Sequence, residues 1–215
     1  MQAAFFARGR GLEGVPTAQG SPYHDDALAD GWNYDPARSK ALLAEAGLTQ
    51  GFSVKMLATA QFGMHKDIAE IVQQYLAAIG IQAELSLPDW STRVSLGTRG
   101  QYDLAIHGVS ADSNDPDGLF VMMDTSLSPS HGRSFGVQAP RPIAALARGR
   151  AEFNEAKRIE IYKDLQRETL DEVPLVGVAS RWQGFGMDKR VVGFTNLPGA
   201  LSTFSSNMLE YTDFA

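Results

Sequence analysis

The chain has 215 residues, 44% of them apolar, which is enough to bury one good hydrophobic core or two small ones. Its formal charge of −6 is spread without a basic stripe, which argues against nucleic acid as a partner. The absence of cysteine excludes a disulfide framework and thiol chemistry. No run of the sequence approaches the roughly 20 apolar residues of a membrane span.

The first 33 residues are punctuated by glycine and proline and hold no lasting periodicity, so residues 1–33 are predicted to be an irregular lead-in segment. A free-standing domain rarely begins with such a loop, and we expect it to pack on a preceding domain. The N-terminus lacks the apolar core and cleavage site of a signal peptide. The protein is therefore either cytoplasmic, or the sequence starts inside a longer chain.

One motif in this segment resembles a cofactor loop. Residues Gly9 to Gly14 spell GxGxxG, the pattern of a dinucleotide-binding turn. That turn needs a strand before it and a helix after it, whereas only a short apolar stretch precedes Gly9 and Val15-Pro16 follows. We therefore predict a plain turn here, and no cofactor.

The next stretch alternates helices and strands. Asp35-Pro36 predicts a helix start, with aspartate as the N-cap, and Gly47 predicts its end. Further elements are expected as a strand over 52–58, a helix over about 64–79, a strand over 81–87 and a short helix over about 90–96. Strand, helix and strand within so few residues form a βαβ unit, so the strands should be parallel.

The strand expected over 102–107 leads into a polar loop. Tyr102, Leu104 and Ile106 alternate with more polar neighbours, and small or polar residues take over from Gly108 to Asn114. Ligands of open α/β sheets bind at the carboxyl ends of strands, so this loop is the candidate site. Its acidic residue, Asp112, is either a turn residue or a carboxylate exposed to a ligand.

Asp115-Pro116 predicts another helix start after this loop. A surface loop is expected over 125–141. The remaining expectations are helices over 143–150 and 154–172, a buried strand over 175–179 and strand-like pieces over 191–194 and 207–211. The predicted fold class is α/β, with a mixed sheet flanked by helices.

The sequence offers little catalytic chemistry. It contains no nucleophile elbow, HExxH, P-loop or CxxC motif. The polar loop resembles part of a calcium loop, but its sixth and twelfth positions hold Asp117 and Met123, so no metal is predicted. The four histidines are widely spaced and are expected to be structural, and Trp90 is expected in the core. A small hydrolase-like or transferase enzyme, with Asp112 and His107 or His65 as acid and base, stays open as an alternative.

Several short motifs occur together in a specific order. They are Tyr34-Asp35-Pro36 with the run from Lys40 to Gly47, Ile71-Val72-Gln73 with Leu76 and Ile79-Gly80-Ile81, Gly100 with Tyr102-Asp103-Leu104, Asp115-Pro116-Asp117, Arg158 with Tyr162, Gln166, Glu172 and Pro174, and Val192-Gly193-Phe194. In order and spacing the chain resembles the extracytoplasmic solute-binding proteins, family 5, of peptide, dipeptide and nickel ABC importers. The resemblance covers about residues 30–196.

The resemblance implies one lobe of a two-lobed, type II periplasmic-binding-protein fold that closes on its ligand. Residues 34–196 would form the later, α/β ligand-binding lobe, and 197–215 a C-terminal return segment, with the N-terminal lobe missing. It further implies a periplasmic, non-enzymatic receptor, whose partners are a small solute or peptide, the ABC permease and the missing lobe. Reuse of such a lobe as an interaction or signalling module is a third possibility.

The resemblance also assigns a site. It makes Asp112 the anchor for a ligand's amino terminus and Gly108, Val109, Ser110 and Ala111 a backbone wall along the ligand, with His65 facing it. Peptide-binding members often supply an arginine from the loop after the first strand or from the strand end. This sequence has Ala60-Gln61-Phe62 and Ile106 there. Opines, sugars, heme-like ligands and metal chelates therefore stay open beside peptides.

Overall fold

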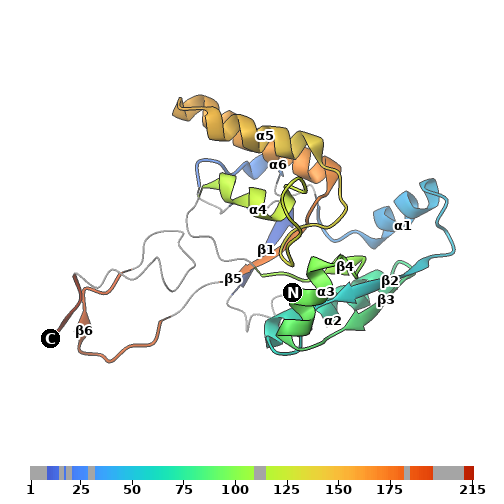
Figure 1. Ribbon diagram of the computed structural model, residues 1–215, viewed down its shortest axis with the longest axis horizontal. Helices are drawn as coiled ribbons and strands as arrows, with labels where there is room; N and C mark the ends of the chain where they lie inside the picture. Colours follow the sequence, from blue (N-terminus) through green and yellow to red (C-terminus); the bar gives the residue numbers. More distant parts are fainter. Residues whose placement is uncertain are drawn as a thin grey trace.

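The computed structural model describes residues 9–14, 17, 21–28, 32–108, 115–181, 185–195 and 211–215. Figure 1 shows two main groups of elements: a small sheet with α2 and α3, and a set of helices that includes α5 and α6. None of the helices in the described ranges is both long enough and apolar enough to cross a bilayer.

The sheet that carries the candidate site has three parallel strands in the order β3-β2-β4. These are β2 (Phe52–Leu57), β3 (Ile81–Ser86) and β4 (Leu104–Ala105). Helix α2 (Gly63–Ala77) connects the first two, which confirms the predicted βαβ unit. The strand expected over 102–107 is shorter than predicted, because only Leu104 and Ala105 pair with β2.

Small and flexible apolar side chains pack α2 onto this sheet. Met56 and Ala58 from β2 and the turn after it, Ala83 from β3 and Ala69 from α2 form one buried cluster. A neighbouring cluster centres on Ile68 of α2 and includes Ile106 and Val178, so it joins the sheet to β5 (Gly177–Arg181). Burying a large apolar side chain contributes about 2 kcal/mol, so these contacts hold the site's end of the sheet in place.

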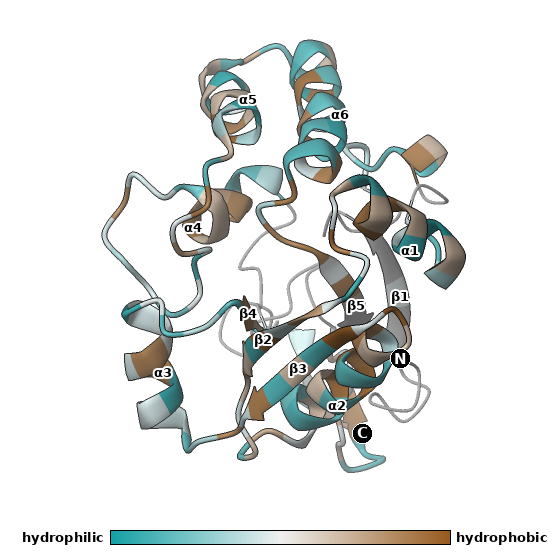
Figure 2. Ribbon diagram, turned by 90° about the vertical axis from the view of Figure 1, so that its right-hand side faces the viewer, coloured by the Kyte–Doolittle hydropathy of each residue, from teal (hydrophilic) through white to brown (hydrophobic). Residues whose placement is uncertain are grey.

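Two helices flank the sheet region, and each begins at an aspartate that caps its first turn. Helix α3 (Trp90–Thr98) begins at Asp89, whose carboxylate accepts a hydrogen bond from the Thr92 backbone N–H. Helix α1 (Pro36–Glu45) begins as predicted, because Asp35 accepts from the backbone N–H of Arg38. No residue of α1 is buried. In Figure 2 this helix lies to one side of the sheet.

The helical group follows the polar loop. The expected helix at Asp115-Pro116 starts as a 3-10 turn, η3 (Pro116–Leu119), and continues as α4 (Phe120–Met123). Helices α5 (Pro140–Ala151) and α6 (Glu155–Glu172) pack on it. Its core is apolar and comprises Leu119, Met123, Ala145, Leu146, Tyr162 and Leu165.

The prediction of a plain turn at Gly9–Gly14 is wrong. These residues form β1 (Gly9–Gly14), which pairs antiparallel with β5. A ladder needs only backbone N–H and C=O groups, so a distant partner stabilises a strand that local composition does not favour. The motif lies within a strand and not at a strand–helix junction, so it lacks the geometry of a dinucleotide loop. A 3-10 turn, η2 (Asp26–Leu28), also lies in the predicted lead-in.

The C-terminal part forms a short pair of strands. Strands β6 (Val191–Val192) and β7 (Asp213–Phe214) are antiparallel. The piece predicted over 191–194 is thus partly confirmed, while most of the piece predicted over 207–211 lies outside the described residues. The proposed domain boundaries stay a prediction.

An arginine of α6 joins the helical group to the end of the polar loop. The guanidinium of Arg158 donates to both carboxylate oxygens of Asp115 at 2.8 Å. It also donates to the Gly149 carbonyl at 2.9 Å and the Tyr23 hydroxyl at 3.0 Å. Asp117 accepts in the same way from Arg150 at 2.9 Å. The Asp-Pro-Asp motif is therefore a structural clamp, in which both acidic side chains face arginines.

Substituting Arg158→Met should lower the free energy of unfolding by about 2 kcal/mol, because the Asp115 carboxylate, the Gly149 carbonyl and the Tyr23 hydroxyl each lose a donor. Denaturant unfolding measures this loss. Arg167→Met removes a more exposed arginine from the same helix and should cost less than about 1 kcal/mol. Equal losses for the two variants would contradict the clamp.

Candidate ligand-binding site

Polar side chains tie together the two turns that follow β2 and β3. The buried Thr59 hydroxyl donates to the Pro88 carbonyl at 2.8 Å. The side-chain oxygen of Gln61 accepts from the backbone N–H of Trp90 at 2.6 Å. Both turns leave the carboxyl edge of the sheet, where α/β proteins place ligands. The start of α3 is thereby held next to the start of α2.

Aromatic and imidazole rings gather at this edge. Phe62 lies 5.2 Å from Trp90 and 5.5 Å from His65, centroid to centroid, in edge-to-face arrangements. Trp90 continues the set to His131 at 5.4 Å, and His131 to His107 at 5.6 Å. We call these five residues the ring cluster. Its geometry is that of favourable aromatic pairs.

Part of the ring cluster is open to solvent. Phe62 is 46% exposed and Trp90 is partly exposed, so the prediction that Trp90 is a core residue is only half right. A rigid, partly exposed aromatic surface at the carboxyl edge of a sheet is suited to contact a solute's apolar face.

A fully buried arginine lies next to the ring cluster and hydrogen-bonds to the backbone beside it. Arg93 of α3 has 0% exposure. Its guanidinium donates through one terminal nitrogen to the His131 carbonyl and through the other to the Ile106 carbonyl, both at 2.8 Å. Its Cζ lies 5.6 Å from the centre of the Trp90 ring. One side chain thus joins α3, the end of β4 and the loop that carries His131.

Two glycines allow the backbone to approach the imidazoles. A Cβ at Gly108 would lie 2.9 Å from Nε2 of His65, and one at Gly132 would lie 2.7 Å from Nε2 of His107. Both rings are confined by their neighbours, so a side chain at either position would force a shift. His65 therefore lies directly behind the backbone at Gly108, where the polar loop begins.

The buried surroundings keep two of the imidazoles neutral. Burial, aided by the positive charge of Arg93, lowers the pKa of His107 from its ordinary 6.5 to about 4. Burial and Arg93 also lower the pKa of His131. At neutral pH the guanidinium of Arg93 is positively charged. The carboxylate of Asp89, at the start of α3, is negatively charged, because hydrogen bonds from Thr92 and Ser91 lower its pKa to about 2.

The predicted site residues divide into two groups. The structure places the ring of His65 next to the backbone of Gly108, and the ligand contacts that the resemblance implies for both residues stay predictions. Val109, Ser110, Ala111 and Asp112 lie outside the described residues, and their roles stay predictions. No group of three or more potential metal ligands occurs in the described part of the chain.

Several residues of this site were missed by sequence reasoning. His131 and Phe62 sit in loops whose composition carries no distinctive signal, and Arg93 occupies an unremarkable position in a short helix. These residues lie close together because of the order of β2, β3 and β4 in the sheet, which the sequence does not show. Trp90 offered a weak signal, since it directly follows the turn after a predicted strand.

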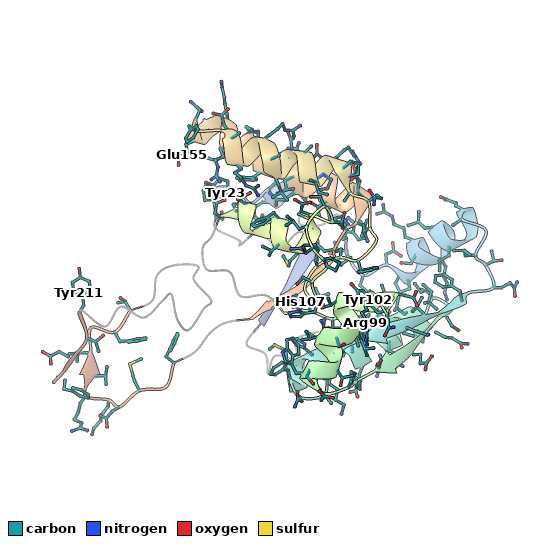
Figure 3. The ribbon with its side chains drawn as sticks, in the orientation of Figure 1. Tyr23, Arg99, Tyr102, His107, Glu155 and Tyr211 are labelled. Carbon is teal, nitrogen blue, oxygen red and sulfur yellow. The ribbon has the colours of Figure 1, made fainter. Side chains whose placement is uncertain are left out.

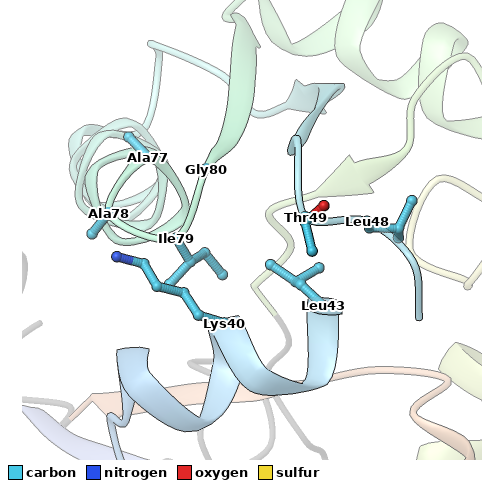
Figure 4. Close-up of a pocket in the computed structure, with 8 residues that line it drawn as sticks. All are labelled: Lys40, Leu43, Leu48, Thr49, Ala77, Ala78, Ile79 and Gly80. Atoms are coloured by element: carbon cyan, nitrogen blue, oxygen red, sulfur yellow. The ribbon is translucent and has the colours of Figure 1, made fainter. Parts of the chain in front are cut away.

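A cavity at the opposite edge of the sheet is the main rival site. It has a volume of about 440 Å³ and lies between α1 and the end of α2. Figure 4 shows its lining, in which the Lys40 ammonium accompanies mostly aliphatic side chains. Thr49 and Gly80 precede β2 and β3, so this is the amino edge of the sheet. Few polar groups converge there, and the carboxyl edge is the better ligand site.

This α/β architecture is that of a lobe of a periplasmic binding protein of type II fold. The sequence model of the bacterial extracellular solute-binding proteins, family 5 middle region, matches residues 1–130. The chain belongs to this family, which confirms the family resemblance.

Named relatives are consistent with membership of this family. The dipeptide-binding protein of Escherichia coli (strain K12) is 28% identical over 200 residues, which are 91% of this chain and 37% of that protein. The structure of the binding protein AgaA in complex with agropinic acid, from A. tumefaciens R10, superposes with a TM-score of 0.80 at 30% identity. That match covers 99% of this chain and 43% of AgaA.

A dipeptide-binding protein from Pseudoalteromonas sp. SM9913, in complex with Met-Leu, matches with a TM-score of 0.72 at 21% identity, over 100% of this chain and 42% of that one. At that identity the match shows the fold alone. The chain thus spans well under half the length of each of these relatives. The relatives are binding proteins, and none of them supports the enzyme alternative.

The depressed pKa of His107 predicts acid sensitivity. Between pH 6.5 and about 4 the unfolded chain binds a proton at this residue and the folded chain does not, so the free energy of unfolding falls as the pH falls. The loss amounts to about 3 kcal/mol. Denaturant unfolding from pH 7 to 4 should show a shallower decline for His107→Gln than for the wild type.

Carboxylates that titrate in the same pH range also change the free energy of unfolding. Their contribution cancels when variant and wild type are compared, because both proteins contain them. An unchanged slope in His107→Gln would mean that this imidazole is not held neutral by its surroundings.

Proposed function

We propose that this chain forms one ligand-contacting lobe of an extracytoplasmic receptor that delivers a peptide-like or other small solute to an ABC importer. The proposal rests on one observation above all: the ring cluster presents Phe62 and Trp90, partly exposed, at the carboxyl edge of the sheet. Family membership is consistent with such a role. In this proposal the protein is periplasmic and does no chemistry on its ligand.

The solute would bind between this lobe and a second lobe, and closure of the two would exclude water from it. The aromatic rings would supply contact area on one side. Asp112 would anchor a positively charged or hydrogen-bond-donating group, and the backbone from Gly108 to Ala111 would line the ligand. The clamp at Asp115 supports this role, since it fixes one end of the segment that carries Asp112.

The partners in this proposal are the solute, the permease subunits at the membrane and the second lobe. Relatives named for dipeptides and for agropinic acid make peptides and opines the first solutes to examine. No cofactor or metal is part of the proposal.

The test is thermal unfolding of the full-length protein with a panel of solutes. Met-Leu, agropinic acid, glucose and a nickel chelate represent the open classes. A solute at 100 times its dissociation constant should raise the free energy of unfolding by about 2.7 kcal/mol. Asp112→Ala should remove this gain, while Asp171→Ala, which changes an exposed carboxylate on α6, should keep it.

Three results are informative. A gain that survives Asp112→Ala would keep the receptor and remove Asp112 as its anchor. No gain with any solute would contradict the receptor. Consumption of a solute during the assay would favour an enzyme instead.

A further inference from the structure

Helix α1 receives little support from the rest of the described chain. None of its residues is buried, and it takes part in none of the hydrophobic clusters that the described residues form. Figure 1 shows it set apart from the other helices. It spans only Pro36–Glu45, and isolated helices shorter than about 12 residues are marginal in water, because helix nucleation is unfavourable. We therefore expect α1 to pack on a further surface.

The side of α1 that faces α2 does not supply such a surface. Lys40 and Leu43 point from α1 toward the end of α2, and they line the cavity of about 440 Å³ between the two helices (Figure 4). Closely packed helices interdigitate their side chains and leave no space of this size. This contact therefore contributes little to the stability of α1.

The opposite side of α1 carries an apolar centre between two opposite charges. Arg38, Ala41, Leu42 and Glu45 are spaced i, i+3, i+4 and i+7, so they share one face of the helix. All four are exposed, Leu42 to 54%. Arg38 and Glu45 are separated by about 10 Å along the helix axis, which is too far for them to pair with each other. This face is therefore open to a partner.

The order of these charges is unfavourable for α1 by itself. The first turn contains Arg38 and no acidic residue, and the last turn contains Glu45 and no basic residue. The helix dipole favours the reverse order, with acidic residues at the start and basic residues at the end. A neighbouring helix with the same charge order that runs antiparallel corrects this, because its acidic end lies beside Arg38 and its basic end beside Glu45. A second copy of α1 has this charge order.

We propose that α1 is the interface of a homodimer, in which it packs antiparallel on α1 of a second copy about a two-fold axis. In one register Arg38 of each copy pairs with Glu45 of the other, and Leu42 of each copy packs on Ala41 of the other. The two-fold axis makes each of these contacts occur twice. Two short helices bury less area than a standard interface, so the dimer is weak, with a dissociation constant of about 10 µM or above. It leaves the carboxyl edge of the sheet open.

The test is sedimentation velocity of the full-length protein without solute, from about 1 µM to about 1 mM. The wild type should pass from the mass of a monomer to that of a dimer. Leu42→Glu places a carboxylate in the apolar centre and should raise the dissociation constant at least about tenfold. Phe153→Glu makes the matched change at a residue that is 98% exposed between α5 and α6, and should keep the dimer. Figure 3 shows the nearby Glu155 at the tip of the helical group, away from α1.

Charge reversal tests the antiparallel register. Glu45→Arg puts a basic residue in the last turn, which favours the isolated helix, but in the dimer it places two positive charges opposite each other. This variant should raise the dissociation constant about tenfold. Adding Arg38→Glu restores opposite charges across the interface, and the double variant should dimerise about as tightly as the wild type. A loss caused by damage to α1 itself would persist in the double variant.

Two kinds of result would overturn this inference. One is a monomer at every concentration, and protection of the α1 amides from hydrogen exchange in that monomer would mean that another part of the full-length protein covers the helix. The other is a dimer whose affinity is unchanged by Leu42→Glu, or a double variant that stays as weak as Glu45→Arg, since either would assign dimerisation to a different surface or register. Neither result bears on solute binding, so the proposed function is tested separately.

Discussion

The two hydrogen bonds from Arg93 to the carbonyls of Ile106 and His131 are the contact on which the site depends. β4 pairs through only two residues, so its end needs another constraint. The guanidinium supplies it, because its planar fork holds two backbone segments at fixed separation. The same side chain lies 5.6 Å from the centre of the Trp90 ring, and its charge adds to burial in lowering the pKa values of His107 and His131, so it contributes to both the shape and the charge of the site.

A second arginine acts at the other end of the polar loop. Arg158 holds the Asp115 carboxylate, and Arg93 holds the carbonyl just before His107. Ile106 before the polar loop and Asp115 after it are thus each held by a guanidinium on a different helix. The helical core around Tyr162 positions Arg158, and the sheet positions Arg93. The packing of each group of elements thereby bears on where the chain leaves β4 and where it enters η3.

The elements with strong local signals could be predicted from the sequence. Asp35 before Pro36, the helical spacing of Ile68 with Val72 and the alternation from Ile81 onward each follow from neighbouring residues. β1 could not be predicted, because its glycines offer no packing and its pairing comes from β5, far along the chain. The site shows the same limit: the family resemblance named His65 and Gly108 as ligand-facing residues, whereas Arg93 and His131 meet only through tertiary packing.

The most direct test of the proposed site is a crystal structure of the full-length protein with whichever panel solute stabilises it. The account predicts the solute at the carboxyl edge of the sheet, in contact with the rings of Trp90 and His131 and with the backbone at Gly108. A solute seated instead in the cavity beside α1, or bound without contact to the ring cluster, would contradict it.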